Sequence, residues 1–108
     1  MVEIKGIIPP MITPINDDES INEQELRRQV ERLIKAGVHG LFVLGTNGEG
    51  YILSDKEKEK VLTVVIDETK GRVPIYAGTG GVGTKETIRL SKMAESLGTD
   101  VLSIITPW

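Results

Sequence analysis

Residues 41–50 read Leu-Phe-Val-Leu-Gly-Thr-Asn-Gly-Glu-Gly, a short apolar run followed at once by a polar turn bracketed by glycines. Such a run is typical of a strand that is buried on both faces, as in a parallel sheet. In parallel α/β folds, ligands bind at the carboxyl ends of the strands. The turn therefore marks a place for a ligand, and its glycines would let backbone N–H groups approach an anion closely.

The rest of the chain repeats one pattern, an apolar run followed by an amphipathic segment, with the length of about thirty residues that a βα unit takes. Strands are expected at residues 6–13, 40–44, 73–78 and 101–106. Each helix between them begins at a capping residue and ends at a glycine. The expected limits are Asn22 to Gly37, Ser54 to Gly71 and Thr84 to Gly98. The apolar faces carry Leu26, Val30, Leu33 and Ile34, then Val61, Val64 and Val65, then Leu90, Met93, Ala94 and Leu97.

The order β-α-β-α-β-α-β implies parallel strands joined by right-handed crossovers. Two closures fit this order, an open doubly wound sheet and part of a (β/α)8 barrel. A complete barrel takes about 250 residues. This chain has 108 residues, so it would supply three βα units and a fourth strand of a barrel domain truncated after that strand.

Composition excludes several classes of function. Charged residues make up 27% of the chain and the net charge is −3, so no broad basic surface for nucleic acid is expected. The chain has no cysteine, which excludes a disulfide framework and a thiolate metal site and fits a reducing compartment. Pro9, Pro10 and Pro14 interrupt the only apolar stretch near the amino terminus, so neither a secretion signal nor a membrane span is expected. We expect a soluble cytoplasmic protein.

Four segments of the chain resemble the dihydrodipicolinate synthase / N-acetylneuraminate lyase family of class I, Schiff-base aldolases. They are Gly45-Thr46-Asn47-Gly48-Glu49 and residues 6–14, 71–80 and 105–108. The segments fall at the spacings of the family without gaps, and the match covers the whole chain. The resemblance implies a (β/α)8 barrel, of which residues 1–108 are the amino-terminal part, and a homo-oligomer, usually a tetramer built from two tight dimers.

The resemblance also implies a chemistry. Enzymes of this family bind pyruvate or another 2-oxo acid as an imine on a lysine, and the resulting enamine attacks an aldehyde, or a carbon–carbon bond breaks in the reverse direction. No metal or organic cofactor is implied. By position, Thr46 matches a catalytic hydroxyl that joins a proton relay and touches the substrate carboxylate. Asn47 matches the adjacent carboxylate-binding position, Gly48 allows the turn, and Glu49 braces neighbouring loops.

Two departures from the family pattern bear on the substrate. The synthases typically carry two hydroxyl residues where this chain has Thr46 and Asn47, and the amide resembles branches that act on other 2-oxo acids. Which 2-oxo acid and which aldehyde react therefore stays open. Trp108 stands where a tyrosine is common.

The imine-forming lysine and a second relay tyrosine belong to later strands of the family's barrel. The lysines of this chain are Lys5, Lys35, Lys56, Lys58, Lys60, Lys70, Lys85 and Lys92. Lys5 precedes the first expected strand, Lys70 lies at the expected end of a helix, and the others are predicted on helix surfaces. We therefore expect residues 1–108 alone to form no Schiff base.

Other polar residues are assigned structural roles. His39 lies before the second expected strand, at the end of the barrel opposite the usual active site, and is predicted to be structural or solvated. The glycine-rich run 78–83 lacks the ending of a phosphate loop and is interpreted as a tight turn. Residues 17–19 are acidic and are predicted to form a solvated turn rather than a metal site. Tyr51 either lines the pocket or covers the second helix.

Three hypotheses of function remain. The leading one is the amino-terminal segment of a lyase, with the carboxylate-binding turn but without the nucleophile. The second is a catalytically inactive barrel fragment that acts only by association with a partner. The third is a small flavodoxin-like binding domain, which needs a further helix to cover its sheet.

Overall fold

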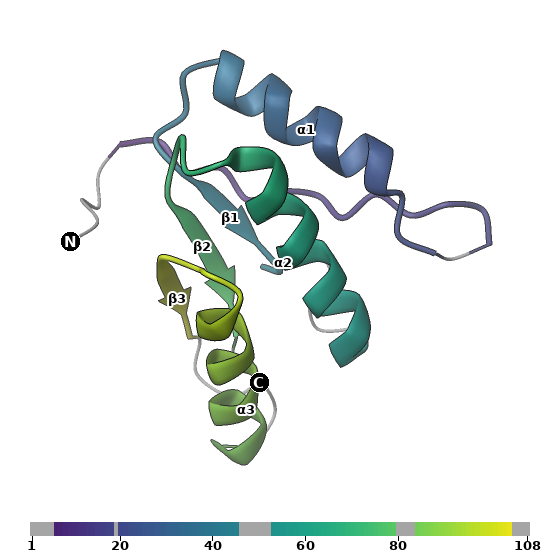
Figure 1. Ribbon diagram of the computed structural model, residues 1–108, viewed down its shortest axis with the longest axis vertical. Coiled ribbons are helices and arrows are strands. Elements are labelled where there is room, and N and C mark those ends of the chain that lie inside the picture. Colours follow the sequence, from purple (N-terminus) through teal and green to yellow (C-terminus); the bar gives the residue numbers. More distant parts are fainter. Residues whose placement is uncertain (1–5, 19, 46–52, 80–83, 105–108) are drawn as a thin grey trace.

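The computed structural model describes residues 6–18, 20–45, 53–79 and 84–104, which form three helices and a parallel sheet of three strands (Figure 1). In chain order, the elements are α1 (Glu23–Lys35), β1 (Leu41–Val43), α2 (Asp55–Thr69), β2 (Ile75–Gly78), α3 (Thr84–Ser96) and β3 (Val101–Ser103). All three predicted helices are confirmed. Within this part of the chain, no helix is long and apolar enough to cross a membrane.

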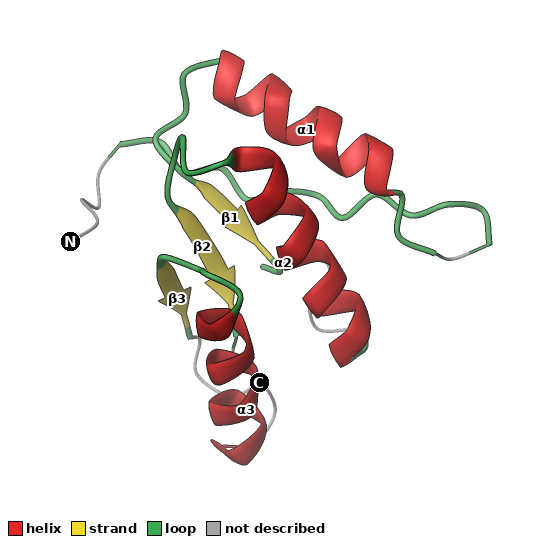
Figure 2. Cartoon of the chain, viewed as in Figure 1, coloured by secondary structure: helices red, strands yellow, loops and turns green. Residues whose placement is uncertain are grey.

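The sheet follows the order of the chain, β1-β2-β3, and both pairs of neighbours are parallel (Figure 2). Right-handed crossovers between successive neighbouring strands place their connecting helices, α2 and α3, on the same face of the sheet. A doubly wound sheet reverses its strand order and has helices on both faces. The structure therefore favours the barrel over the open sheet, and with it over the flavodoxin-like domain.

Side chains alternate between the two faces of this sheet. Ile75 and Ala77 of β2 belong to the apolar core on the helix side. Tyr76 points to the opposite face, as does its neighbour in register, Phe42 of β1. We call this face, which carries Phe42 and Tyr76 and lies opposite the helices, the inner face.

The prediction of a strand at residues 6–13 is wrong. This segment makes a single parallel bridge to the sheet, between Pro10 and Phe42, with hydrogen bonds from Met11 N to Phe42 O (2.7 Å) and from Phe42 N to Pro9 O (3.1 Å). Pro9 and Pro10 have no N–H to donate, so a regular ladder cannot form through them. The other strands lie where they were predicted but are shorter, and residues 105–106 lie outside the described residues.

The predicted starts of α1 and α2 are confirmed in detail. The Asn22 side chain accepts a hydrogen bond from Glu25 N at 3.0 Å at the start of α1. At the start of α2, Ser54 Oγ accepts from Glu57 N at 3.2 Å, and Glu57 Oε1 accepts from Ser54 N at 2.8 Å. These two bonds complete a capping box, which satisfies two backbone N–H groups that a helix start leaves unpaired.

The end of α2 differs from the prediction. The expected glycine, Gly71, does have a positive φ of 75°, but Lys70 before it already takes the left-handed conformation at φ 52°. The ends of α1 and α3 follow the prediction, because Gly37 (φ 90°) and Gly98 (φ 100°) supply the left-handed residue there.

An apolar core fills the space between the sheet and the helices. Its fully buried side chains include Leu26 and Val30 of α1, Val61, Leu62 and Val65 of α2, and Leu41 of β1. Leu33, Ile34, Met93 and Leu97 are half-buried at its margin.

One lysine was wrongly predicted on a helix surface. Lys58 of α2 is only 8% exposed, whereas its neighbours Lys56 and Lys60 are exposed. Spacings of three and four residues place Lys58 on the same side of α2 as Val61 and Leu62. Its alkyl chain therefore packs with the apolar side of the helix, as long basic side chains commonly do.

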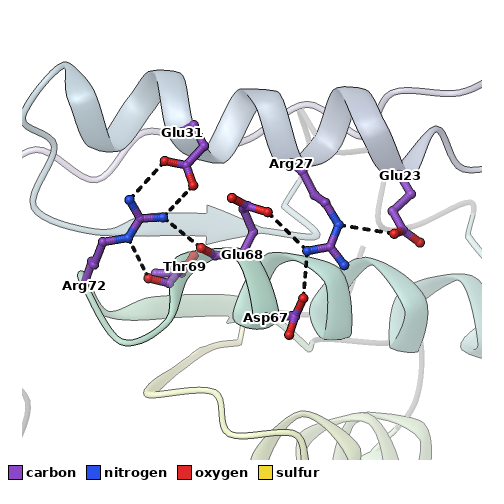
Figure 3. Close-up of polar contacts among 7 residues, drawn as sticks. All are labelled: Glu23, Arg27, Glu31, Asp67, Glu68, Thr69 and Arg72. Carbon is purple, nitrogen blue, oxygen red and sulfur yellow. Dashed lines mark hydrogen bonds and ion pairs between the residues drawn. The ribbon is translucent and has the colours of Figure 1, made fainter.

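Ion pairs join α1 to the carboxyl-terminal part of α2 and the turn that follows it (Figure 3). Arg27 of α1 donates hydrogen bonds to Asp67 (2.7 Å) and Glu68 (3.2 Å) of α2, which raise the pKa of the guanidinium. Arg72 donates two hydrogen bonds to the carboxylate of Glu31, at 3.0 and 2.6 Å. This bidentate pair lowers the pKa of Glu31 to about 2.

Candidate functional site

The candidate site lies where β1 and β2 end. The residues predicted to bind and act on substrate, Thr46, Asn47 and Gly48, lie outside the described residues, as does Glu49, which is predicted to support the turn. Tyr51, Trp108 and residues 80–83 of the glycine-rich run also lie outside them. The structure describes the framework on both sides of them. This framework consists of Leu44 and Gly45 after β1, Gly78 and Thr79 at the end of β2, and Ser103 at the end of β3.

Leu44 makes the turn out of β1. In a continuing strand, Leu44 would follow Phe42 onto the inner face, because side chains alternate with a period of two. Instead, Leu44 is 6% exposed and belongs to the same apolar core as Val43. Its φ of 63° explains this departure, since a left-handed residue breaks the alternation. For a residue with a side chain this conformation costs about 1–2 kcal/mol, and such backbone strain is concentrated at functional sites.

The carbonyl group of Leu44 lies against Gly78. A Cβ built on Gly78 would be 2.5 Å from the Leu44 carbonyl oxygen and 3.4 Å from Gly45 N. Because Gly78 alternates with Ala77, that Cβ would point to the inner face. The Leu44 carbonyl therefore lies on the inner face at the carboxyl end of the sheet. Gly45 follows it there, since a Cβ on Gly45 would be 3.3 Å from the ring of Phe42.

Thr79 ties the end of β2 to its surroundings. Its side chain is 2% exposed, and its hydroxyl oxygen accepts a hydrogen bond from Ser91 Oγ of α3 at 2.9 Å. Its backbone N–H donates to Ser103 O at 3.1 Å. The ends of β2, β3 and the adjoining helix are thus held together. Sequence reasoning missed both Leu44 and Thr79. A threonine directly after an apolar strand was the available signal for Thr79.

The opposite end of the sheet holds structural hydrogen bonds. His39 is exposed. Its ring Nδ1 accepts a hydrogen bond from Ile7 N at 2.9 Å, and its backbone N–H donates a hydrogen bond to Ile7 O at 2.8 Å. Asp100 has a matching role one strand later, because its Oδ2 accepts from Ile75 N at 2.9 Å. Each side chain, just before β1 or β3, thus accepts a hydrogen bond from a backbone N–H that a neighbouring strand would otherwise accept. The structural role predicted for His39 is confirmed.

The acidic turn before α1 forms as predicted, as far as it is described. The carboxylate of Asp18 accepts hydrogen bonds from the hydroxyl (2.6 Å) and the N–H (3.1 Å) of Ser20, and these bonds lower the pKa of Asp18. Glu19 lies outside the described residues. Among the residues that the structure describes, no three histidine or acidic side chains are grouped closely enough to hold a metal ion.

Comparisons with known proteins agree with this geometry. The sequence profile of the dihydrodipicolinate synthetase family matches residues 3–108. The chain is 45% identical over 107 residues to a 4-hydroxy-tetrahydrodipicolinate synthase of Methanopyrus kandleri, and the match covers 98% of the chain and 36% of that enzyme. It is 36% identical over 106 residues to an N-acetylneuraminate lyase of Citrobacter koseri, covering 98% of the chain and 36% of the lyase.

A crystal structure matches as well. YagE, a prophage protein of the dihydrodipicolinic acid synthase family from E. coli K12 in complex with pyruvate, superposes with a TM-score of 0.92 at 40% identity. The match covers 95% of this chain and 35% of YagE. The chain thus spans about a third of the length of each of these three proteins.

Proposed function

Because the chain belongs to the dihydrodipicolinate synthetase family, with the (β/α)8 barrel fold of its structural neighbours, we propose that it is part of a class I aldolase. In this proposal, the complete protein is a lyase or synthase that acts on pyruvate or another 2-oxo acid. Residues 1–108 form the amino-terminal part of its single barrel domain. The observation that carries the proposal is the family match over residues 3–108, with the Leu44–Gly45 turn at the carboxyl end of β1.

The reaction proceeds through an imine. The amine of a lysine outside residues 1–108 condenses with the ketone carbon of the 2-oxo acid and releases water. The protonated imine withdraws electrons from the neighbouring carbon, and loss of a proton there gives an enamine that attacks an aldehyde. Thr46 and Asn47 bind the substrate carboxylate, with Gly48 allowing close approach of the backbone. Thr46 also relays a proton, and Glu49 supports the turn.

The choice of substrate depends on Asn47. An amide can donate two hydrogen bonds where a hydroxyl donates one, so it suits a 2-oxo acid with a further polar group as well as pyruvate. The pyruvate bound to YagE supports pyruvate as the first substrate to test. We further propose a homo-oligomer that needs no metal or organic cofactor. A cytoplasmic location and the absence of nucleic-acid partners stay predictions from composition.

Borohydride trapping tests the proposal. The full-length protein is incubated with pyruvate and borohydride, which delivers hydride to the C=N bond and leaves a stable secondary amine on the lysine. We expect a pyruvate-dependent adduct on one lysine outside residues 1–108. Thr46→Val and Asn47→Ala should raise the pyruvate concentration needed for half-maximal trapping, whereas Thr63→Val, at an exposed position on α2, should leave it unchanged.

Two results would count against the proposal. A full-length protein that forms no adduct with any 2-oxo acid does not use imine chemistry. An adduct on residues 1–108 alone would show that one of the lysines in this chain is the nucleophile. Peptide mapping of the reduced adduct identifies the modified lysine, so it distinguishes the second result from the expected adduct outside residues 1–108.

The alternative, an inactive fragment that acts by association, has one observation in its favour. Ile88 of α3 (50%), Leu102 of β3 (37%) and Ile104 (58%) expose large apolar side chains. In this alternative the exposed surface is covered by a partner molecule. The intact mass of the protein purified from its source separates the hypotheses, since an enzyme of this family requires a chain about three times as long, as the 36% coverage indicates.

A further inference from the structure

The end of β2 shapes the turn that leaves β1. Leu44 lies opposite Gly78, because Val43 and Ala77 are partners in the parallel register. The Leu44 side chain is held in the core, whereas its carbonyl group crosses to the inner face. Gly45 follows it and lies against the ring of Phe42. Leu44 and Gly45 are the last described residues before the predicted carboxylate-binding residues 46–48.

Only a residue without a side chain fits opposite this turn. A Cβ at residue 78 would be 2.5 Å from the Leu44 oxygen and 3.1 Å from its carbonyl carbon, and Cβ atoms do not approach other heavy atoms within 3.0 Å. The obstructing atoms belong to the backbone, so no rotation of a side chain can relieve the contact. Gly78 does not have a positive φ. An alanine at this position would therefore clash with the Leu44 carbonyl group without adding strain to the backbone of residue 78.

We propose that Gly78 is a positioning residue of the 2-oxo-acid site, because only a residue without a side chain allows the Leu44–Gly45 peptide to lie on the inner face beside it. Gly78 touches no substrate in this proposal and acts through the backbone of the preceding strand's turn. The inference rests on the proposed function, since it assigns Thr46 and Asn47, the two residues after Gly45, to the substrate carboxylate.

The test compares Gly78→Ala with the wild type in the full-length protein, by two separate measurements. Crystal structures should show the Leu44 carbonyl displaced from residue 78, so that its oxygen lies at least 3.0 Å from the new Cβ. In borohydride trapping, the pyruvate concentration for half-maximal adduct should rise about 10- to 100-fold. An ordinary van der Waals contact of 3.4 Å in place of 2.5 Å requires a displacement of about 1 Å, and a misplacement of that size costs up to about 100-fold. The maximal trapped fraction should change little, because the lysine is not affected.

Gly98→Ala is the matched control. Gly98 has a φ of 100° and open space around its Cβ position, so alanine there strains the backbone at the end of α3 without touching the turn. Both variants should lower the melting temperature. Only Gly78→Ala should raise the half-maximal pyruvate concentration. If both variants raise it equally, a general loss of stability explains the result and the proposal is overturned.

A second variant decides the matter if Gly78→Ala does not fold. Leu44→Gly keeps the left-handed conformation accessible but removes the side chain that holds the turn in the core, and it should also raise the half-maximal pyruvate concentration. An unchanged value would overturn the proposal. If the wild type forms no imine at all, the proposed function fails. The structures then decide the positioning role alone, which an unmoved Leu44 carbonyl in Gly78→Ala would refute.

Discussion

Lys70 ends α2 in the left-handed conformation, at φ 52°, although Gly71 directly follows it. For a residue with a Cβ, this conformation costs about 1–2 kcal/mol. Glycine avoids that cost but loses about 0.5–1 kcal/mol more conformational entropy on folding. The Lys70 N–H still donates to Ile66 O at 3.2 Å, and glycine would keep this bond. Loss of the lysine charge at the helix end subtracts about 0.3 kcal/mol. We therefore expect Lys70→Gly to raise the free energy of unfolding by about 0.5 kcal/mol.

The control for this prediction is Lys70→Ala. Alanine keeps the Cβ and its conformational cost, and it removes the same positive charge from the end of the helix, which is worth about 0.3 kcal/mol at an exposed position. Guanidinium unfolding followed by circular dichroism measures all three proteins. The order of stability should be glycine, lysine, alanine. If the Lys70→Gly and Lys70→Ala proteins are equally stable, the left-handed conformation of Lys70 is not a source of strain, and the reasoning is refuted.

Two further predictions concern the polar contacts of the helices. Ser54→Ala removes one half of the capping box and should lower the free energy of unfolding by about 1 kcal/mol in the same assay, whereas Ser54→Thr should keep most of it. Equal losses in both variants would contradict the cap. The pKa of Glu31 lies at about 2, below its ordinary value of 4.5, so its pair with Arg72 stabilises the fold above about pH 4.5 and ceases to do so as the pH falls through 2. Glu31→Gln should therefore be less stable than the wild type at pH 7, with the difference vanishing near pH 2; a difference that persists at low pH would contradict the ion pair.

The sequence predicted the helices well because their signals are local. Asn22 is hydrogen-bonded to Glu25, and Ser54 to Glu57, in each case three residues further along the chain. Such hydrogen bonds can be inferred without knowing the fold. The apolar spacing of each helix likewise depends only on its own residues. The structural role of His39 was also predicted, although its partner, Ile7, is distant in the sequence.

The predictions that failed depended on neighbours. The segment at residues 6–13 is apolar enough for a strand, but whether it pairs depends on which N–H groups meet β1, and Pro9 and Pro10 have none to offer. Lys58 was predicted on the surface because it lies in a run of alternating charges. Its burial follows from the side of α2 on which Val61 and Leu62 pack, which a charge pattern does not report.

By itself, the sequence determined the family, the succession of parallel strands and helices, and the place of the glycine-bracketed segment after β1. The tertiary structure decided that helices lie on one face of a sheet in chain order, and that the chain leaves β1 through a left-handed leucine whose carbonyl lies over Gly78. That contact joins residues 34 positions apart, Leu44 and Gly78. Its physical basis is steric, because a Cβ at residue 78 and the Leu44 oxygen cannot occupy the same space. This conflict arises only when β1 and β2 lie side by side.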